Sequence, residues 1–456
     1  DRNAKLFYIR NFLHKPQPLH KIFRNLQADA LAGHVSGDVD FAVESQQYEA
    51  RLQLNRLQLG YLQELLPDVS GSLSGDLIIM GSGNDWSRLK VMGSASAENV
   101  SYKGLALNTL NCSFKTEGDD VVIDAAAAKV QNGGTLGLKG KITKGRNLQL
   151  EFRGTHFDLS LLQAVSDKAD LTGLADFSGT VNGDSANPQV TLYFAAHHGS
   201  LFKQPFHTLH GSASGSLDGI GIDSFYMEND GHETWRVQGT VGFTGEKRIN
   251  LRVDTMGARM EDIAALVAPD QPLTGNVDNV IQFTGTLDHI DAVGYIHFYR
   301  GSYRGVLLSG MDGDYTIKDN VMTVQDFHIF SPMVDMVLNG TVDRALNLNL
   351  QVAAKYIDIK RFEHKLPYPA SGQGSFYGSV GGSLDRPLFD GRLAIPELVI
   401  NGETLTEAKG YVSYRGSILH FDDFGFKHNG GSMMMDLNVN LATNNLAGTL
   451  ELANVD

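Results

Sequence analysis

The stretch Ile249–Gly285, INLRVDTMGARMEDIAALVAPDQPLTGNVDNVIQFTG, decides the fold because versions of it recur about every hundred residues along the chain. From 249 to 254 apolar and polar residues alternate, and this period of two places the apolar side chains on one face of a sheet. The apolar cluster at 263–267 has three- and four-residue spacing, which predicts one or two helical turns ended by prolines. Thr274 and Gly275 then turn the chain into the next strand.

Two sets of glycines keep the same period. The first set consists of dipeptides that follow a short apolar helical segment, with separations of 102, 102 and 97 residues: Ser70-Gly71, Thr172-Gly173, Thr274-Gly275 and Ser371-Gly372. The second set is spaced by 103, 99 and 101 residues: Gly37, Gly140, Gly239 and Gly340. Two registers with one period predict a chain built of repeats of about 100 residues, with junctions near 70, 172, 274 and 371.

Composition narrows the class of protein. Charged residues are 20% of the 456, and the net charge of −14 argues against nucleic-acid binding, which needs a basic patch or stripe. The single Cys112 cannot form an internal disulfide. No run of 18 apolar residues predicts a membrane-spanning helix. Because the sequence starts at Asp1 without a Met, we expect a piece of a longer protein.

Residues 1–27 differ from the rest in charge. Six Lys and Arg residues against Asp1 give this segment a charge of +5 and leave −19 for the remainder. Its apolar residues are spaced as in two short amphipathic helices broken by Pro16 and Pro18, with the cations on the other face. The segment is therefore expected to be either a helical cap over the first strand or a contact with an anionic membrane surface.

From residue 28 to 456 the pattern predicts an all-β chain of about 28 strands, roughly seven in each repeat, with short helices only at the junctions. These helices are expected near 59–66, 158–165, 261–267 and 358–363. Open sheets rarely exceed about ten strands, and the apolar face of a sheet must be covered. Two architectures solve this problem: a string of sandwiches, or one long antiparallel sheet folded along its length into a U-shaped trough. The apolar junction helices favour the trough because separate sandwiches would have polar linkers instead.

Several phrases of the sequence resemble a known family. They are Leu-Asp-Arg-Pro at 384–387 with Phe-Asp-Gly-Arg-Leu after it, Gly-Gly turns before alternating strands, and the junction Asp158-Leu-Ser-Leu-Leu. The chain resembles the AsmA-like superfamily of bridge-type lipid transfer proteins, and within it the TamB group, over nearly all of residues 28–456. The resemblance implies an elongated β-taco, a U-shaped sheet with an apolar groove, that conducts phospholipid between the inner and outer membranes of diderm bacteria. It also implies a periplasmic location, an inner-membrane anchor missing from this piece, and an outer-membrane partner of the BamA type.

The residue pattern, considered without the resemblance, also predicts a lipid ligand. An open trough has a continuous apolar lining, which is a liability in water unless apolar groups such as acyl chains occupy it. The candidate lipid-binding residues are those of the clearest alternating runs: Leu148, Leu150, Phe152, Ile249, Leu251, Val253, Leu346, Leu348, Leu350, Val352, Met433, Met435, Leu437, Val439 and Leu441. The methionines among them suit a pliable surface. For any single side chain, an ordinary place in a filled core is the competing interpretation.

The sequence contains no signature of an enzyme. Neither a G-x-S-x-G elbow nor an H-E-x-x-H motif is present, and no catalytic residue, metal site or cofactor is predicted. The predicted function is inter-membrane phospholipid transport. The alternatives are a scaffold or chaperone for the assembly of outer-membrane proteins or autotransporters, which would offer strand edges to a client, and a tandem β-sandwich array with a structural or adhesive role.

Overall fold

The computed structural model describes residues 20–62, 68–83, 89–131, 133–144, 146–164, 170–201, 204–229, 233–261, 263, 272–366 and 368–453. These residues form 27 strands in one open antiparallel sheet, with almost no helix. The expected all-β class is therefore confirmed. By their internal contacts the strands divide into two units, with the boundary after β13.

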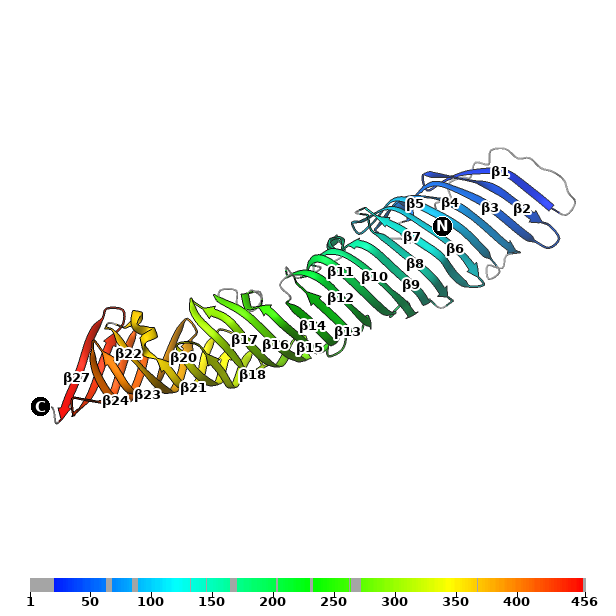
Figure 1. Cartoon of the computed structure of the whole chain (residues 1–456). Helices are drawn as coiled ribbons and strands as arrows, with labels where there is room; N and C mark the ends of the chain where they lie inside the picture. The colour runs from blue at the N-terminus through cyan, green and yellow to red at the C-terminus, as the bar shows by residue number, and fades with distance from the viewer. Residues whose placement is uncertain are drawn as a thin grey trace. The chain divides into compact units, whose positions relative to one another are not determined.

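In unit 1 each strand pairs with the strands before and after it along the chain, so the strands form a meander joined by short connections (Figure 1). Its strands are β1 (His20–Ala30), β2 (Gly33–Ala42), β3 (Gln47–Gln58), β4 (Val69–Ser82), β5 (Lys90–Tyr102), β6 (Leu105–Glu117), β7 (Asp120–Val130), β8 (Thr135–Thr143), β9 (Asn147–Asp158), β10 (Leu171–Asp184), β11 (Gln189–Leu201), β12 (Gln204–Ser216) and β13 (Gly219–Glu228). Short 3-10 helices interrupt the meander, and those within the described residues are η1 (Leu59–Leu62) and η3 (Leu159–Ala164).

Unit 2 continues the same pattern of sequential antiparallel pairing. Its strands are β14 (Thr234–Gly242), β15 (Arg248–Arg259), β16 (Leu273–Thr286), β17 (Ile290–Tyr303), β18 (Val306–Lys318), β19 (Val321–Phe330), β20 (Val334–Asp343), β21 (Asn347–Asp358), β22 (Ala370–Ser383), β23 (Arg386–Ile400), β24 (Glu403–Arg415), β25 (Ile418–His428), β26 (Gly431–Asn440) and β27 (Asn445–Ala453). Another 3-10 helix, η4 (Ile359–Lys365), lies between β21 and β22.

The sheet is repeat-like, and the glycines of the two sequence registers share a backbone conformation, except for Gly37, whose φ is not positive. The first register opens β4, β10, β16 and β22, with φ of 130°, 115°, 141° and 152° at Gly71, Gly173, Gly275 and Gly372. In the second register φ is 138°, 131° and 139° at Gly140, Gly239 and Gly340. Side chains rarely adopt these angles, so glycine is required there. Successive members of the first register lie six strands apart, whereas the sequence predicted about seven strands in each repeat.

Bulges recur in alternate strands, and they interrupt the period of two from which strands are recognised in the sequence. At six of the described bulges a residue with positive φ breaks the alternation, and its backbone N–H donates to a polar side chain of the next strand. The donor and acceptor pairs are Asn25 and Asp38, Arg56 and Ser74, His156 and Asp176, Gly257 and Asp278, Asp326 and Asn339, and Asp423 and Asp436. Each acceptor satisfies a donor that the ladder leaves unpaired.

The predicted helical segment 1–27 is only partly within the described residues, because 1–19 lie outside them. Residues 20–27 belong to β1, so the helical prediction is wrong for this part. The physical reason is the bulge between Phe23 and Leu26, which shifts the period of two and produces a spacing like that of a helix. Within the described residues, the junction helices predicted near 59–66, 158–165 and 358–363 correspond to the 3-10 helices η1, η3 and η4, and Met260 and Glu261 are helical at the other junction.

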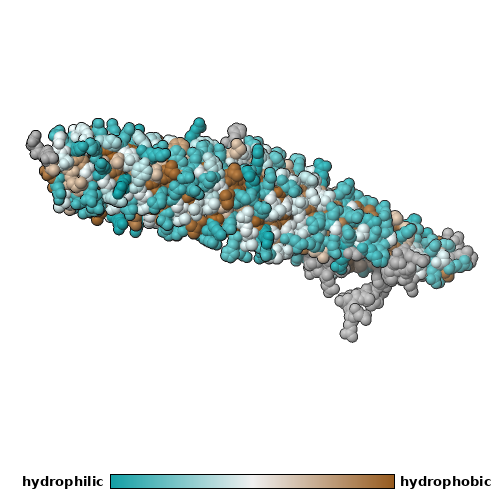
Figure 2. All heavy atoms as spheres, turned by 90° about the horizontal axis from the view of Figure 1, so that it is seen from below, coloured by the Kyte–Doolittle hydropathy of each residue, from teal (hydrophilic) through white to brown (hydrophobic). Residues whose placement is uncertain are grey.

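One face of the sheet, called here the apolar face, carries cross-strand rows of apolar residues, while the polar face carries the intervening residues. In unit 2, one cluster on the apolar face includes Val324, Leu350 and Phe376, and another includes Ile395 and Phe424. In Figure 2 hydrophilic and near-neutral residues cover most of the surface in view, and hydrophobic residues form separate patches between them. The strict alternation of the strands thus produces one face suited to water and one that requires cover.

Candidate functional site

Unit 1 has an apolar groove with a volume of about 830 Å³ on the apolar face of β6 to β13. Apart from Gly137 and Arg153, every residue that lines it is Ala, Val, Leu or Phe. The lining consists of Leu105, Leu107, Leu110, Ala126, Ala128, Leu136, Gly137, Leu138, Phe152, Arg153, Phe157, Leu159, Leu162, Leu171, Ala175, Phe177, Val190, Leu192, Phe194, Ala196, Leu201, Leu209 and Phe225. Gly137 and Arg153 are paired with each other between apolar neighbours, so alternation directs the Arg153 side chain to the polar face.

Aromatic rings packed over glycines shape the floor of the groove. Phe177 pairs with Gly154 on β9, and a Cβ atom at Gly154 would come within 2.3 Å of the Phe177 ring. Phe152 lies in the same way over Gly179, where a Cβ atom would approach the ring to 2.5 Å. Each ring therefore lies across the neighbouring strand because that strand has no side chain there. This packing covers backbone with apolar surface and fixes the rotamers of the lining.

Helix η3 forms one wall of the groove through Leu159 and Leu162. Its first turn is held by Asp158, whose Oδ1 accepts hydrogen bonds from the backbone N–H and the hydroxyl of Ser160 at 3.0 and 2.6 Å. This arrangement satisfies donors at the start of the helix. The apolar cluster predicted at this junction therefore packs beside the sheet and does not form a polar linker.

The groove can bind a ligand only through apolar contact, since apolar side chains make up nearly all of its lining. Many of these residues, among them Leu110, Phe177 and Phe194, are only half-buried, so the lining is in contact with solvent. Its volume falls in the range of about 300–1,000 Å³ that is usual for ligand pockets. Each methylene group transferred into it contributes about 0.8 kcal/mol, so ten methylenes contribute about 8 kcal/mol before the entropic cost of binding.

The sequence-predicted residues of β9 lie on the apolar face, but only one of them lines the groove. Leu148, Leu150 and Phe152 alternate along β9, and their partners on β10 include Val181 opposite Leu150. Of these three, Phe152 borders the groove. The others continue the same face farther along the strand.

The predicted residues of unit 2 also lie on the apolar face, with two exceptions. Those within strands are Ile249, Leu251 and Val253 on β15, Leu348, Leu350 and Val352 on β21, and Met433, Met435, Leu437 and Val439 on β26. Leu346 and Leu441 lie in the turns beside β21 and β26, and their backbone N–H groups bond to Asp343 and Ser417. These two therefore fall outside the alternating runs to which the sequence assigned them.

Sequence reasoning missed most of the lining of the groove. Leu192 and Phe194 on β11, Phe177 on β10 and Leu138 on β8 were not selected. A weaker signal was present, because Val190, Leu192 and Phe194 recur at period two, although Tyr193 and Ala195 between them are not strongly polar. Alanine and glycine in the neighbouring strands made those strands look weakly apolar, although small residues are what leave room for the rings.

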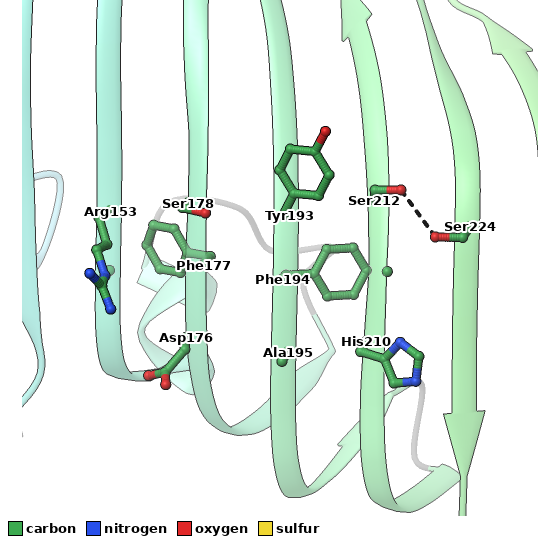
Figure 3. Close-up of a pocket in the computed structure, with 12 residues that line it drawn as sticks. Arg153, Asp176, Phe177, Ser178, Tyr193, Phe194, Ala195, His210, Ser212 and Ser224 are labelled. Carbon is green, nitrogen blue, oxygen red and sulfur yellow. Dashed lines mark hydrogen bonds between the residues drawn. The ribbon is translucent and has the colours of Figure 1, made fainter.

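A second depression, with a volume of about 620 Å³, lies on the polar face of β9 to β13 (Figure 3). It forms where small side chains such as Ser178 and Ala195 stand between the larger Arg153, Tyr193 and His210. The Ser212 hydroxyl is 3.0 Å from the hydroxyl of Ser224, and among the described residues no hydrogen bond joins a serine of the lining to His210. The depression thus lacks a nucleophile activated by a base.

Comparisons of the chain with protein-family models, with curated proteins and with solved structures found no match. Within the part of the chain that the structure describes, none of the helices has the length and hydropathy needed to cross a bilayer.

Proposed function

We propose that the chain binds the acyl chains of phospholipids along its apolar face and conducts them between the two membranes of a diderm bacterium. The observation that carries the proposal is the groove of about 830 Å³ whose lining side chains are apolar and partly open to solvent. A contiguous apolar surface of this kind in a water-soluble sheet is expected to hold an apolar ligand.

The wider setting of the proposal rests on the sequence resemblance to the AsmA-like superfamily. In that setting the sheet is a U-shaped β-taco, the protein lies in the periplasm, and an anchor in the inner membrane and a BamA-type barrel in the outer membrane are its partners. The sequential pairing of strands into a sheet with one apolar face is compatible with a β-taco that binds lipid along its length.

Two adjacent residues of β11 provide the test of the proposal. Phe194 lines the groove, whereas Tyr193 points to the polar face and is 58% exposed. A photo-reactive amino acid at Phe194 should crosslink to diacyl lipid in protein that has been purified without detergent. The same amino acid at Tyr193 should not, because successive side chains of a strand face opposite ways.

Mass spectrometry of the crosslinked products distinguishes the outcomes. Lipid adducts at Phe194 alone support the groove as a lipid site. Equal labelling at both positions indicates adsorption to the surface, and the absence of lipid at both positions refutes the proposal.

A further inference from the structure

A polar pair interrupts the apolar face of unit 2. The hydroxyl of Tyr315 on β18 donates a hydrogen bond of 3.0 Å to Oδ1 of Asn279 on β16. The ring of Tyr315 reaches β16 by lying over Gly294 of β17, where a Cβ atom would come within 2.5 Å of it. Burial raises the pKa of Tyr315, so the phenol remains protonated and donates at neutral pH.

The surrounding residues show that this pair lies on the apolar face. Asn279 is paired with Ile296 of β17, and Tyr315 is paired with Val324 of β19 and packs against the cluster around Leu350. Alternation therefore directs both polar side chains toward the same side as the core of unit 2. Both are half-buried and not sealed, so a ligand on this face can reach them.

The corresponding positions of unit 1 are apolar. A shift of 102 residues, the period of the first glycine register, relates Phe177 to Asn279 and Ala213 to Tyr315. The cross-strand pairing agrees with this relation, because Phe177 pairs with Phe194 as Asn279 pairs with Ile296. The same shift relates Gly211, which is opposite Phe194, to Gly313, which is opposite Ile296, whereas Gly294 opposite Tyr315 corresponds to Leu192 opposite Ala213. The two positions that are Phe177 and Ala213 in unit 1 are thus the hydrogen-bonded Asn279 and Tyr315 in unit 2.

The pair has hydrogen-bonding capacity left over. The oxygen of the Asn279 amide accepts the hydrogen bond from Tyr315. The amide nitrogen has no hydrogen-bond partner among the described residues. Thr255, opposite Asn279 on β15, contacts its backbone oxygen at 3.5 Å and not its side chain. A donor with this geometry in an apolar setting fits a neutral acceptor such as a carbonyl oxygen, because an unpaired polar group there is unfavourable.

We propose that Asn279, oriented by Tyr315, is a binding site for the ester carbonyl of an acyl lipid on the apolar face of unit 2. This inference rests on the proposed function and adds to it a position at which the polar linkage of the lipid is held. Acyl chains would bind along the apolar rows on either side, and the ester carbonyl would accept a hydrogen bond from the Asn279 amide. A purely structural pair would instead be indifferent to whether the lipid contains a carbonyl group.

The test compares two probe lipids with the same chain, a monoacylglycerol and its ether analogue, which lacks the carbonyl group. A photo-reactive amino acid at Ile296, beside Asn279, reports occupancy of unit 2, and one at Leu192 reports the groove of unit 1. In the otherwise unchanged protein, crosslinking at Ile296 should favour the ester about three- to tenfold over the ether, the range of one neutral hydrogen bond. Crosslinking at Leu192 should not distinguish the two lipids.

The matched variant installs the residues of unit 1 by combining Asn279→Phe with Tyr315→Ala. It should reduce the preference at Ile296 to about one while ether labelling persists. Asn279→Leu, which removes only the amide, should give the same ratio if the double variant proves unstable. A preference that survives these changes, or that is absent before them, overturns the inference. Absence of any lipid at Leu192 refutes the proposed function instead, so the two failures are distinguishable.

Discussion

Filling the groove from one residue provides the sharpest prediction. Ala126 on β7 lines the groove and is half-buried, whereas its neighbour Ala127 is exposed on the polar face. Ala126→Trp places an indole in the groove, and Ala127→Trp places the same group in water. The two variants have the same composition and lie on the same strand, so the second is a matched control for the first.

The expected loss of affinity in Ala126→Trp can be estimated from the part of the ligand that the indole displaces. The substitution adds about nine non-hydrogen atoms to the lining, enough to occupy the space of several methylene groups. Displacement of even two methylenes, at about 0.8 kcal/mol each, lowers the binding free energy by about 1.6 kcal/mol and the affinity about fifteenfold. Because the groove has room for the ring, the free energy of unfolding should change by less than the roughly 1–3 kcal/mol that overpacking of a filled core costs.

The assay combines displacement of a fluorescent fatty acid with thermal unfolding. Ala126→Trp should weaken binding at least tenfold with a nearly unchanged Tm, and Ala127→Trp should leave both unchanged. If Ala126→Trp lowers Tm strongly while Ala127→Trp does not, the groove is a filled core and the reasoning is refuted. Equal affinity in the two variants would contradict the position of the ligand.

Three further results are expected. Leu350, only 7% exposed within its cluster, should tolerate no charge: Leu350→Asp should cost about 3 kcal/mol or more in chemical denaturation, against roughly 0.5 for Gln351→Asp on the polar face. Asp176→Ala removes the acceptor for the backbone N–H of His156 and should cost about 1 kcal/mol, while Asp176→Asn should retain most of the stability; equal losses would exclude a bulge-capping role. The pKa of Asp38 is lowered chiefly by the β1 backbone N–H that it accepts, so this bond stabilises β1 above the ordinary carboxyl pKa and is lost as pH falls through the lowered value. Hydrogen exchange in β1 should therefore accelerate only in that acid range, and acceleration near neutral pH would contradict the assignment.

The sequence alone determined the class of fold and, in strands without a bulge, the face on which alternating residues lie. Alternation at period two is a local property, and it placed Leu150, Leu251 and Leu437 on the apolar face without knowledge of their neighbours. The glycine registers could also be recognised in the sequence, because a backbone with φ near 115° to 152° admits glycine and little else. Alternation failed where a bulge inserts a residue, as in β1, since the local pattern then has the spacing of a helix.

Only the tertiary structure decided which apolar residues fill a core and which line a groove. Leu350 and Leu192 have the same alternating pattern in the sequence, yet the first packs in a cluster and the second borders open volume. The difference arises from residues on other strands, whose small side chains leave space or whose large ones occupy it. The bond between Asn279 and Tyr315 was likewise invisible, since it joins residues 36 positions apart across an intervening strand. Local periodicity assigns each side chain to a face, but cross-strand register decides which side chains meet there.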